Sequence, residues 1–365
     1  MILENIKKYV LNILSVYNIE KTYWKYRKNV QIKKLTQSQK EEIKKYYKEN
    51  FGISVTTRDH ELLYSICGEY KKEFMPFSVY LDLLNELSPY KYKKILDDKS
   101  LYDWMFPDIC FPKRVVFCCN GVAYYYSKEN IRKEVCKTEL LEKIKNLNNC
   151  IIKPSIDSSA GIGVRSITTT DGIVTETGRP VDELIESYKG NYVIERKIIN
   201  NDNLKRLNPS SCNTLRIHTW RNRTKASIEF VSAFLRVGRK DSLVDNGFAG
   251  GIAIPVGNDG KLSNSGCTLK KYERIEKSDT GIIFKGYAIE NFSRIVDTAI
   301  KAHGNLPHFD FVGWDFTIDE NDNVIMIEFN ADPDMRLDQL IFLNTCLLEK
   351  QHEILTAVYE KKKSK

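Results

Sequence analysis

The sequence predicts an α+β fold in which a mostly helical N-terminal region precedes a longer segment of strands and single helices. Apolar residues recur at helical spacing as far as about Leu96. Short apolar runs bounded by turn residues begin after Asp97 and Asp98, and single amphipathic segments interrupt those runs. Hairpins that alternate with single helices are typical of α+β packing, whereas a doubly wound parallel sheet alternates each strand with a helix.

The helical region covers residues 1–96 and contains two separate signals. The segment Thr36-Gln37-Ser38-Gln39 has the pattern of a helix start and precedes an amphipathic stretch rich in Lys, Glu and Tyr. Apolar residues at helical spacing among lysines predict a basic amphipathic helix within residues 1–28. Such a helix either packs on its own domain or lies on an anionic membrane surface. The packed alternative is favoured because a charged helix face is usually only a solvated face.

The second segment contains two predicted helices, Lys133–Leu147 and Val181–Tyr188. The strands predicted from its apolar runs are Arg114–Cys119, Val122–Tyr126, Ile151–Lys153, Val164–Thr168, Tyr192–Ile198, Thr214–Trp220, Ala226–Val237 and Gly251–Val256.

Charge and cysteine content limit the classes of protein that this chain can belong to. The net charge of +8 is concentrated near the two ends, including a basic tail at 351–365, and no nucleic-acid-binding motif occurs, so nucleic acid is not an expected partner. Nine cysteines without a CxxC pair suggest neither a zinc site nor a disulfide framework. We find neither a spanning segment nor a signal peptide, and we expect a cytoplasmic protein, with membrane contact only through the basic helix.

A pair of β-prone runs between Phe311 and Asn330 predicts a hairpin that carries carboxylates. A turn centred on Asn321-Asp322 would place Asp315 directly opposite Glu328, with Asn330 one diagonal step away. The same count predicts the following pairs: Glu320 with Asn323, Ile318 with Ile325, Phe316 with Ile327, and Trp314 with Phe329.

Facing carboxylates repel each other, so the pair favours a bound cation, and these oxygen ligands suit Mg²⁺. On this interpretation, neutralising Asp315 or Glu328 should leave stability unchanged or raise it. The alternative is that both are ordinary solvent-facing acidic residues.

Cys150–Val164 is predicted to form a strand, a loop of small residues and a second strand. It lacks the Gly-Lys-Ser/Thr of a Walker loop and is not a dinucleotide fingerprint. Glycines let backbone N–H groups approach phosphates closely, although a hairpin turn explains the same pattern. The residues of this segment that could bind phosphate are Lys153, Ser158, Ser159, Gly161 and Gly163. Further on, Arg216 and His218 alternate on one strand and should share a face, and His218 is expected to be structural.

Asp315 and the later Glu328-x-Asn330, followed by Asp332-Pro333, resemble the magnesium-binding signature of the ATP-grasp superfamily. The resemblance covers Asp97 to Asp332. Within the superfamily, the runs Phe234–Arg239 and Val244–Gly251 resemble the sugar-transfer-associated branch found with capsule and exopolysaccharide genes. The resemblance to the superfamily implies an ATP-grasp fold, in which two α+β subdomains grip ATP. The lid subdomain would cover residues 97–190 and the magnesium-bearing subdomain 191–350.

The resemblance also implies roles for individual residues. Lys99 and Lys153 match lysines that contact the nucleotide, and the glycine-bearing loop matches the lid over the triphosphate. Arg216 resembles the arginine that neutralises the transferred phosphate, while Arg236 and the Asp245–Gly251 loop belong to the acceptor side. The remaining implied sites are the adenine site at Glu195, Arg196 and Ile198, the ribose site at Asp202, and two Mg²⁺ ions at Asp315, Glu328 and Asn330. Asp202 is a substitute, because Asn200–Asn203 departs from the usual glycine-then-glutamate pattern.

The activity that the resemblance implies is ATP-dependent ligation of a small-molecule carboxylate to an amine or a sugar-linked acceptor, through an acylphosphate. The product would be an amide in a capsule or exopolysaccharide component. Two alternatives remain open: a phosphotransferase that acts on a sugar hydroxyl, and a non-catalytic nucleotide-binding module. The sequence does not indicate the oligomeric state.

Overall fold

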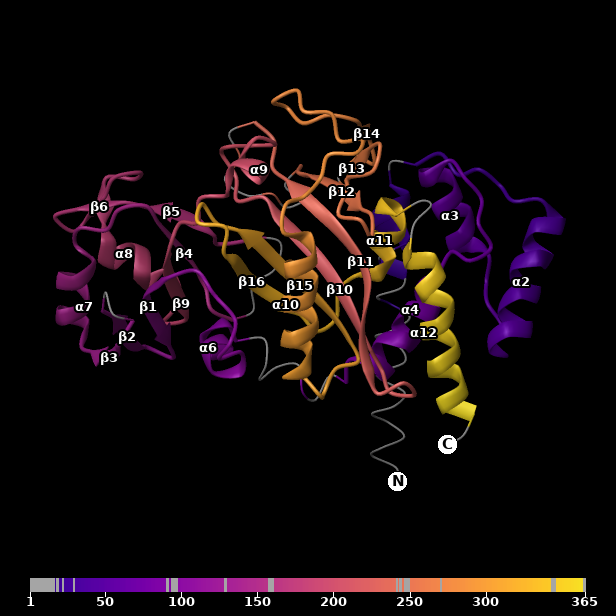
Figure 1. The fold of residues 1–365 in the computed structure, drawn as a ribbon, viewed down its shortest axis with the longest axis horizontal. Coiled ribbons are helices and arrows are strands. Elements are labelled where there is room, and N and C mark those ends of the chain that lie inside the picture. Colours follow the sequence, from indigo (N-terminus) through magenta and orange to yellow (C-terminus); the bar gives the residue numbers. More distant parts are fainter. Residues whose placement is uncertain are drawn as a thin grey trace.

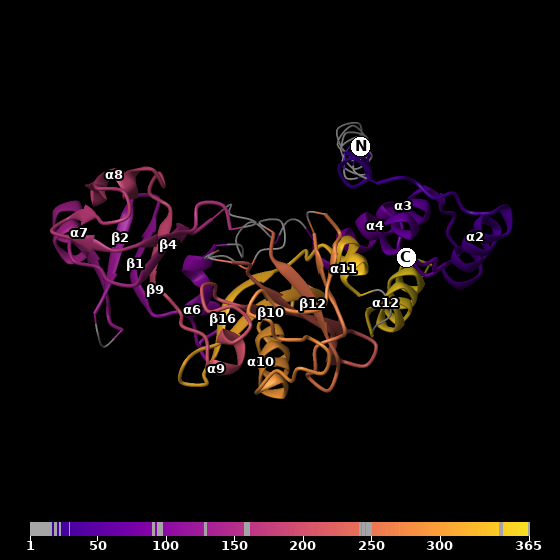
Figure 2. The ribbon, with the colours of Figure 1, turned by 90° about the horizontal axis from the view of Figure 1, so that it is seen from above.

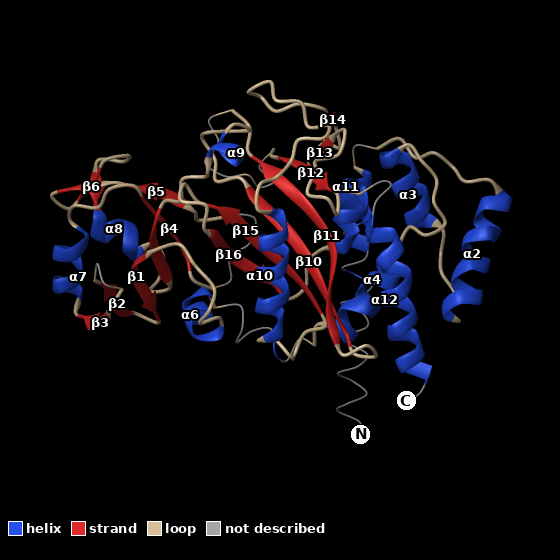
Figure 3. Ribbon diagram, in the orientation of Figure 1, coloured by secondary structure: helices blue, strands red, loops and turns tan. Residues whose placement is uncertain are grey.

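Three parts follow one another along the long axis of the molecule (Figure 1). A six-stranded sheet with two helices lies at one end, a seven-stranded sheet lies in the middle, and helices form the other end (Figure 3). The named strands of the described residues all pair in antiparallel fashion, which confirms the α+β prediction. This computed structural model describes residues 17, 20–21, 23–28, 30–89, 92, 98–127, 130–156, 161–240, 242, 245, 250–269, 271–342 and 346–363.

The helical part combines early and late segments of the chain. Its helices are α2 (Gln37–Phe51), α3 (Arg58–Cys67), α4 (Phe77–Leu87), α11 (Met335–Ile341) and α12 (Cys346–Lys363). Helix α2 begins at the predicted position, because the Thr36 hydroxyl accepts a hydrogen bond from the Gln39 N–H and the Gln39 side chain accepts one from the Thr36 N–H. These two bonds satisfy donors that a helix start otherwise leaves unpaired.

The segment expected to be a separate basic tail is largely the end of α12. Lys362 lies 2.7 Å from Asp82 of α4, so the tail packs against the N-terminal helices. The basic helix predicted within residues 1–28 falls mostly outside the described residues. Among the helices that the structure describes, none has the length and apolar composition needed to cross a membrane.

The six-stranded sheet has the order β3-β2-β1-β9-β4-β5. Its strands are β1 (Arg114–Cys119), β2 (Val122–Tyr126), β3 (Arg132–Val135), β4 (Cys150–Pro154), β5 (Arg165–Ile167) and β9 (Tyr192–Arg196). Helices α7 (Lys137–Ile144) and α8 (Val181–Glu186) share a core with one face of this sheet. The predicted helix Lys133–Leu147 was wrong at its start, because its first residues pair with β2 as strand β3.

Three short strands, β6 (Thr169–Thr170), β7 (Ile173–Val174) and β8 (Arg179–Pro180), form a small separate sheet beside α8. The segment before β1 forms η1 (Lys99–Leu101) and α6 (Tyr102–Met105).

The seven-stranded sheet has the order β14-β13-β12-β11-β10-β15-β16. Its strands are β10 (Thr214–Asn222), β11 (Ser227–Val237), β12 (Ile252–Val256), β13 (Gly266–Thr268), β14 (Arg274–Ile275), β15 (Phe311–Ile318) and β16 (Val324–Asn330). Helix α10 (Phe292–Gly304) packs on one face, and α4, α11 and α12 pack on the other (Figure 2). The short helix α9 (Asp202–Lys205) lies on the connection between the two sheets. Side chains of β10 and β15 therefore point alternately into two different cores.

Three buried histidines give a prediction for the pH dependence of stability. Burial lowers the pKa of His60 and His303 to about 4 and that of His218 to about 3. Histidine in the unfolded chain titrates near 6.5, so the unfolded state binds more protons below that pH. The free energy of unfolding should therefore fall from pH 6.5 toward 4, by about 1.4 kcal/mol per pH unit for each histidine.

Urea unfolding at several pH values between 7.5 and 4.5 measures this slope. The His60→Gln variant should lose the share contributed by one histidine, and the same slope in that variant would contradict the assignment of His60.

Candidate active site

The carboxylate hairpin is formed by β15 and β16. Gly313 pairs with Asn330, and Asp315 pairs with Glu328, as predicted for the part of the hairpin that carries the site. Trp314 and Phe329 also pair as predicted and belong to the apolar core on the opposite face. The predicted face of the hairpin is therefore correct for Asp315, Glu328 and Asn330.

The register farther from the site was predicted wrongly. Phe316 pairs with Met326 and Ile318 pairs with Val324, one residue away from the expected partners. The turn is longer than assumed, because the Asp319 N–H bonds to the Asn323 carbonyl at 3.0 Å, so Asp319 rather than Glu320 faces Asn323. The two arms then differ by one residue, and a β-bulge after Asp315 accommodates the difference.

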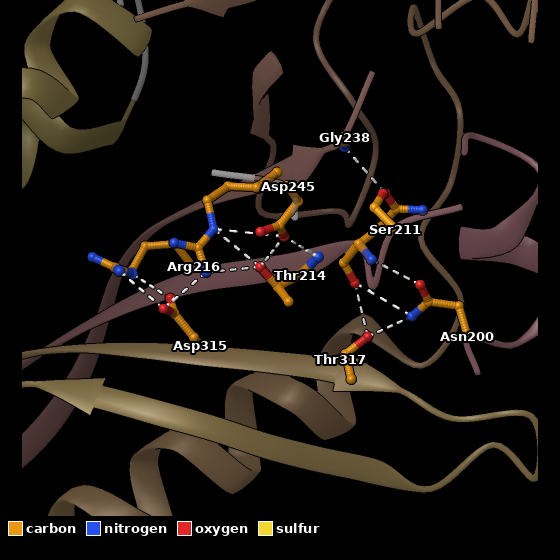
Figure 4. Close-up of polar contacts among 10 residues, drawn as sticks. Asn200, Ser211, Thr214, Arg216, Gly238, Asp245, Asp315 and Thr317 are labelled. Atoms are coloured by element: carbon orange, nitrogen blue, oxygen red, sulfur yellow. Dashed lines mark hydrogen bonds and ion pairs between the residues drawn. The ribbon is translucent and has the colours of Figure 1, made fainter. Parts of the chain in front are cut away.

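Asp315 is fully buried and contacts Arg216 (Figure 4) as well as Arg236. Arg216, its direct neighbour on β10, bonds both carboxylate oxygens through Nε and Nη2, the latter at 3.0 Å. The Nη2 of Arg236 on β11 lies 2.8 Å from Oδ2. Burial opposes ionisation of Asp315, but the two guanidiniums outweigh burial and hold its pKa below the ordinary value. We call these three side chains the arginine clamp.

Thr214 and Asp245 extend the arginine clamp on the β11 side. The Thr214 hydroxyl donates to Asp245 Oδ2 and accepts hydrogen bonds from Arg236 at 2.8 and 3.0 Å. Arg236 Nε also lies 3.8 Å from the Asp245 carboxylate. Burial raises the pKa of Asp245, although Arg236 opposes that rise. Arg236 is therefore held between two buried acidic residues, and its own pKa is raised because their attraction exceeds the effect of burial.

Glu328 faces the other sheet. Its carboxylate lies 3.6 Å from the ammonium of Lys99, which is only 7% exposed. The Lys99 N–H bonds to the Ser155 carbonyl at 3.0 Å, so η1 is tied to the end of β4. Lys99 therefore joins the six-stranded sheet to the carboxylate hairpin. The idea that Asp315 and Glu328 lack compensation for their mutual repulsion was wrong, because each has its own cationic partner.

A second ion-pair chain lies on the six-stranded sheet. Lys153 on β4 lies 2.7 Å from Glu195 on β9, and Arg114 lies 4.0 Å from the same carboxylate. Arg114 also donates to the carbonyls of Lys99 and Ser100, at 2.5 and 3.2 Å. The position of the Lys99 backbone therefore depends on a buried arginine that bonds to it directly.

The segment between the sheets is fixed to the seven-stranded sheet by Asn200. Its amide donates to Thr317 at 2.6 Å and its oxygen accepts from the Asn213 N–H at 2.7 Å (Figure 4). A cavity of about 150 Å³ lies beside this anchor, lined by Asn149, Lys197, Ile198, Ile199, Asn200, Lys205, Pro209, Ser210 and Ser211. Ile198, one of the residues expected at the adenine, therefore faces a hollow at the junction of the sheets.

A family model described as sugar-transfer-associated ATP-grasp matches residues 80–353, which is more than half of the chain. The chain belongs to this family. The match includes both sheets and begins within α4, so the predicted ATP-grasp fold is confirmed. No curated protein sequence matches the chain.

Solved ATP-grasp structures resemble the chain at low sequence identity. The D-Ala:D-Ser ligase VanG from Enterococcus faecalis is 13% identical, with a TM-score of 0.43, over 72% of this chain and 62% of that one. An L-amino acid ligase from Bacillus licheniformis is 11% identical, with a TM-score of 0.37, over 71% and 48%. The N5-carboxyaminoimidazole synthase from Aspergillus clavatus is 9% identical, with a TM-score of 0.36, over 67% and 47%. This chain thus spans about half to three fifths of the length of these structures.

The remaining residues expected from the ATP-grasp resemblance are distributed unevenly. Ser158 and Ser159 lie outside the described residues. Gly161 and Gly163 both have positive φ, and a Cβ on Gly163 would lie 2.9 Å from the Pro154 ring, which explains the need for glycine there. Asp202 is exposed at the start of α9.

Arg196 is expected to contact the adenine, but its contacts in the structure give this role little support. Its N–H already bonds to the Lys113 carbonyl at 2.8 Å, and its side chain bonds to the Asn148 carbonyl at 2.7 Å. Of the three residues expected at the adenine, this leaves Ile198 and Glu195, and the Glu195 carboxylate is already paired with Lys153.

His218 shares a face with Arg216, as predicted, and is fully buried. Its ring stacks on Phe311, and its Nδ1 lies 3.0 Å from the Ser232 hydroxyl. A pKa of about 3, lowered mainly by burial, keeps this ring neutral. These contacts support the structural role expected for His218.

Two polar residues of the candidate site, Thr214 and Arg114, were not predicted from the sequence. Arg114 is 4% exposed in an otherwise apolar strand, and a charged residue in such a strand is a signal that could have been followed. Thr214 gives no comparable signal, because threonine is an ordinary strand residue.

Proposed function

We propose that the protein is an ATP-dependent ligase that activates a carboxylate as an acylphosphate and transfers the acyl group to an amine or another nucleophile. The observation that supports it most is the gathering of cationic side chains from the seven-stranded sheet and from η1 around two carboxylates. Lys99 approaches Glu328, and Arg216 and Arg236 hold Asp315. Lys153 lies on the strand whose end is bonded to the Lys99 backbone. Such a cluster suits a triphosphate that loses its terminal group.

In the first step, an oxygen of the substrate carboxylate attacks the γ-phosphorus of ATP, and the bond from that phosphorus to the β–γ bridging oxygen breaks, which releases ADP. In the second step, the nucleophile attacks the acyl carbon, loses its proton, and phosphate leaves. A guanidinium has five N–H donors, and the contacts with Asp315 use two of those on Arg216. Arg216 can therefore bind a phosphate oxygen while it keeps its carboxylate partner.

The residues at this site fit a magnesium ion. Glu328 is partly exposed, so its carboxylate can take a further ligand, and Asn330, two residues farther along β16, offers an amide oxygen on the same face. A carboxylate offers about four lone-pair positions, and the arginine clamp uses at least three of those on Asp315. We therefore expect Glu328 and Asn330 to contribute most to the binding of a first ion, with the last position of Asp315. A second ion would require one arginine to release Asp315.

Bound Mg²⁺ would neutralise phosphate charge during transfer. The described residues contain no group of three or more His, Cys, Asp or Glu side chains suited to a metal. The proposed site therefore consists of two carboxylates and one amide.

The substrates that we propose are an amino acid or other small carboxylic acid and an amine or amino sugar of a capsule or exopolysaccharide. Support for the sugar comes from the family description alone. A screen of acids against amines and amino sugars that measures ADP release, with hydroxylamine as a trap, tests the proposal. Acid-dependent ADP release with hydroxamate formation is the expected result. A phosphorylated sugar without hydroxamate would identify a phosphotransferase instead, and the absence of ADP release with every pair would contradict the ligase.

Lys99→Ala and Lys153→Ala are each expected to weaken the binding of Mg·ADP at least tenfold, or about 1.4 kcal/mol. Lys99 lies against the carboxylate hairpin, and Lys153 lies on the strand whose end is bonded to the Lys99 backbone, so the loss of either removes positive charge that phosphates would face. Calorimetric titration measures the change. Lys133→Ala is the matched control, because Lys133 lies on the same sheet with a side chain 73% exposed, paired only at the surface with Glu139. An unchanged affinity in both site variants would contradict these assignments.

A further inference from the structure

A groove separate from the carboxylate hairpin lies between α6 and the β2–β3 hairpin. Its volume is about 500 Å³, within the range typical of small-ligand sites. The residues that line it are Ser100, Leu101, Asp103, Trp104, Tyr126, Asn130 and Arg132. The η1–α6 segment therefore has Lys99 at the nucleotide side and contributes its next residues to the groove.

Trp104 is the most unusual residue of this groove. Its side chain is 86% exposed, whereas Trp220 and Trp314 are 3% and 0% exposed. An indole is large and apolar, so exposure of nearly the whole ring costs stability that burial would recover. Trp24 is also exposed, at 56%, but the guanidinium of Arg27 lies 5.0 Å from its ring centroid. An exposed indole at the edge of a groove favours a ligand that stacks on it.

The opposite wall of the groove carries Arg132 and Tyr126. Arg132 lies over the Tyr124 ring, 5.0 Å from its centroid, and Tyr126 is almost wholly buried at the base of this wall. Asp103, the acidic residue of the groove, is bonded to Arg114 at 2.8 Å, which offsets its charge. The groove therefore presents the indole of Trp104 on one side and the guanidinium of Arg132 on the other.

We propose that this groove binds a saccharide that carries a carboxylate, such as a uronic acid unit of a polysaccharide. A pyranose ring has an apolar C–H face that fits the exposed indole, and its hydroxyl groups suit the polar side chains of Ser100 and Asn130 in the lining. The planar guanidinium of Arg132 matches a carboxylate through two parallel hydrogen bonds. Neither a purely apolar ligand nor a neutral sugar would use the charge of Arg132.

The groove is linked to the nucleotide side through Arg114. This buried arginine bonds to Asp103 at the groove and lies near Glu195, which pairs with Lys153. A saccharide held at Trp104 would thus lie one side-chain layer from the phosphate-facing lysines. The inference concerns a binding site and needs no turnover, so it goes beyond the proposed ligase activity and can fail independently of it.

Titration of the protein with trigalacturonate, and with maltotriose as an uncharged trisaccharide, tests the groove by calorimetry and saturation-transfer NMR. Trigalacturonate should bind at least tenfold more tightly than maltotriose. Trp104→Ala should weaken both at least tenfold. Arg132→Gln should remove the preference for trigalacturonate and leave maltotriose binding unchanged. Trp24→Ala is the matched control for Trp104→Ala, because Trp24 is an exposed tryptophan in the helical part. Lys133→Gln is the matched control for Arg132→Gln, because Lys133 is its neighbour in sequence. Both control variants should bind the two trisaccharides like the wild type.

Equal binding of trigalacturonate by the wild type and Trp104→Ala would overturn the proposal, and so would the absence of binding of either trisaccharide to the wild type. Mg·ADP titration of the same variants separates this failure from a failure of the ligase proposal. Trp104→Ala is expected to bind Mg·ADP within twofold of the wild type, so a loss of folding would be recognised.

Discussion

Asp315→Asn is expected to abolish ATP-dependent turnover and to lower the free energy of unfolding by about 3–5 kcal/mol. The asparagine keeps the volume of the side chain but leaves two guanidiniums, only 13% and 14% exposed, without the carboxylate that both contact. An uncompensated buried charge is far more costly than a lost surface pair. This expectation reverses the one drawn from the sequence, in which neutralising Asp315 relieves repulsion and leaves stability unchanged or higher.

Glu328→Gln is the matched control for this substitution. Its carboxylate is 31% exposed and 3.6 Å from Lys99, so the variant should lose activity with a change in stability below about 1 kcal/mol. Urea unfolding monitored by tryptophan fluorescence, together with an ADP-release assay, measures both properties. If the two variants unfold at the same urea concentration, the arginine clamp does not contribute to stability as we describe.

Gly313→Ala is expected to cause nearly complete loss of activity and to destabilise the protein by about 1–3 kcal/mol, as overpacking typically does. A Cβ at Gly313 would lie 2.9 Å from Pro333 Cβ and 3.3 Å from both Arg216 Cδ and His218 Cδ2. Pro333 cannot easily move, because its carbonyl accepts a hydrogen bond from the Tyr80 hydroxyl at 3.1 Å. The added methyl group would therefore push Arg216 away from Asp315 or displace the segment after Asn330.

Gly304→Ala provides the comparison for Gly313→Ala. Gly304 ends α10, has no heavy atom within 4 Å of an added Cβ, and lacks a positive φ. Alanine is favoured over glycine in a helix, so this variant should be neutral or slightly stabilised. Activity in Gly313→Ala close to that of Gly304→Ala would show that the close approach at Gly313 is not required.

Much of the hairpin could be predicted because its determinants are local. Along each strand, core-facing and site-facing side chains alternate, from Gly313 to Phe316 and from Phe329 to Asn330, and this alternation determines the face that each side chain occupies. The bulge could not be predicted, because it depends on a three-residue turn that the polar run from Asp319 to Asn323 does not specify uniquely. The error nevertheless lies on the turn side of Asp315, so the site was unaffected.

The arginine clamp could not be derived from the sequence, because it depends on the order of strands. Arg236 and Asp315 are far apart in sequence and meet only because β10 lies between β11 and β15. Neither hydrophobic periodicity nor turn residues indicate which strand neighbours which. The family resemblance implied roles for Arg216 and Arg236. It did not indicate that both arginines contact Asp315, which is itself proposed as a metal ligand.

The helical part of the molecule is completed by residues from opposite ends of the sequence. Ile43 and Tyr47 of α2 share a core with Ile354 and Leu355 of α12, and the Gln351 side chain donates to the Glu73 carbonyl at 2.6 Å. During synthesis on the ribosome, α2, α3 and α4 emerge before both sheets but lack this core until residues 346–363 have left the exit tunnel. Both sheets can form before then, since their contacts lie between β1 and β16. These helices are therefore made before both sheets, and we expect them to become stable only after both sheets.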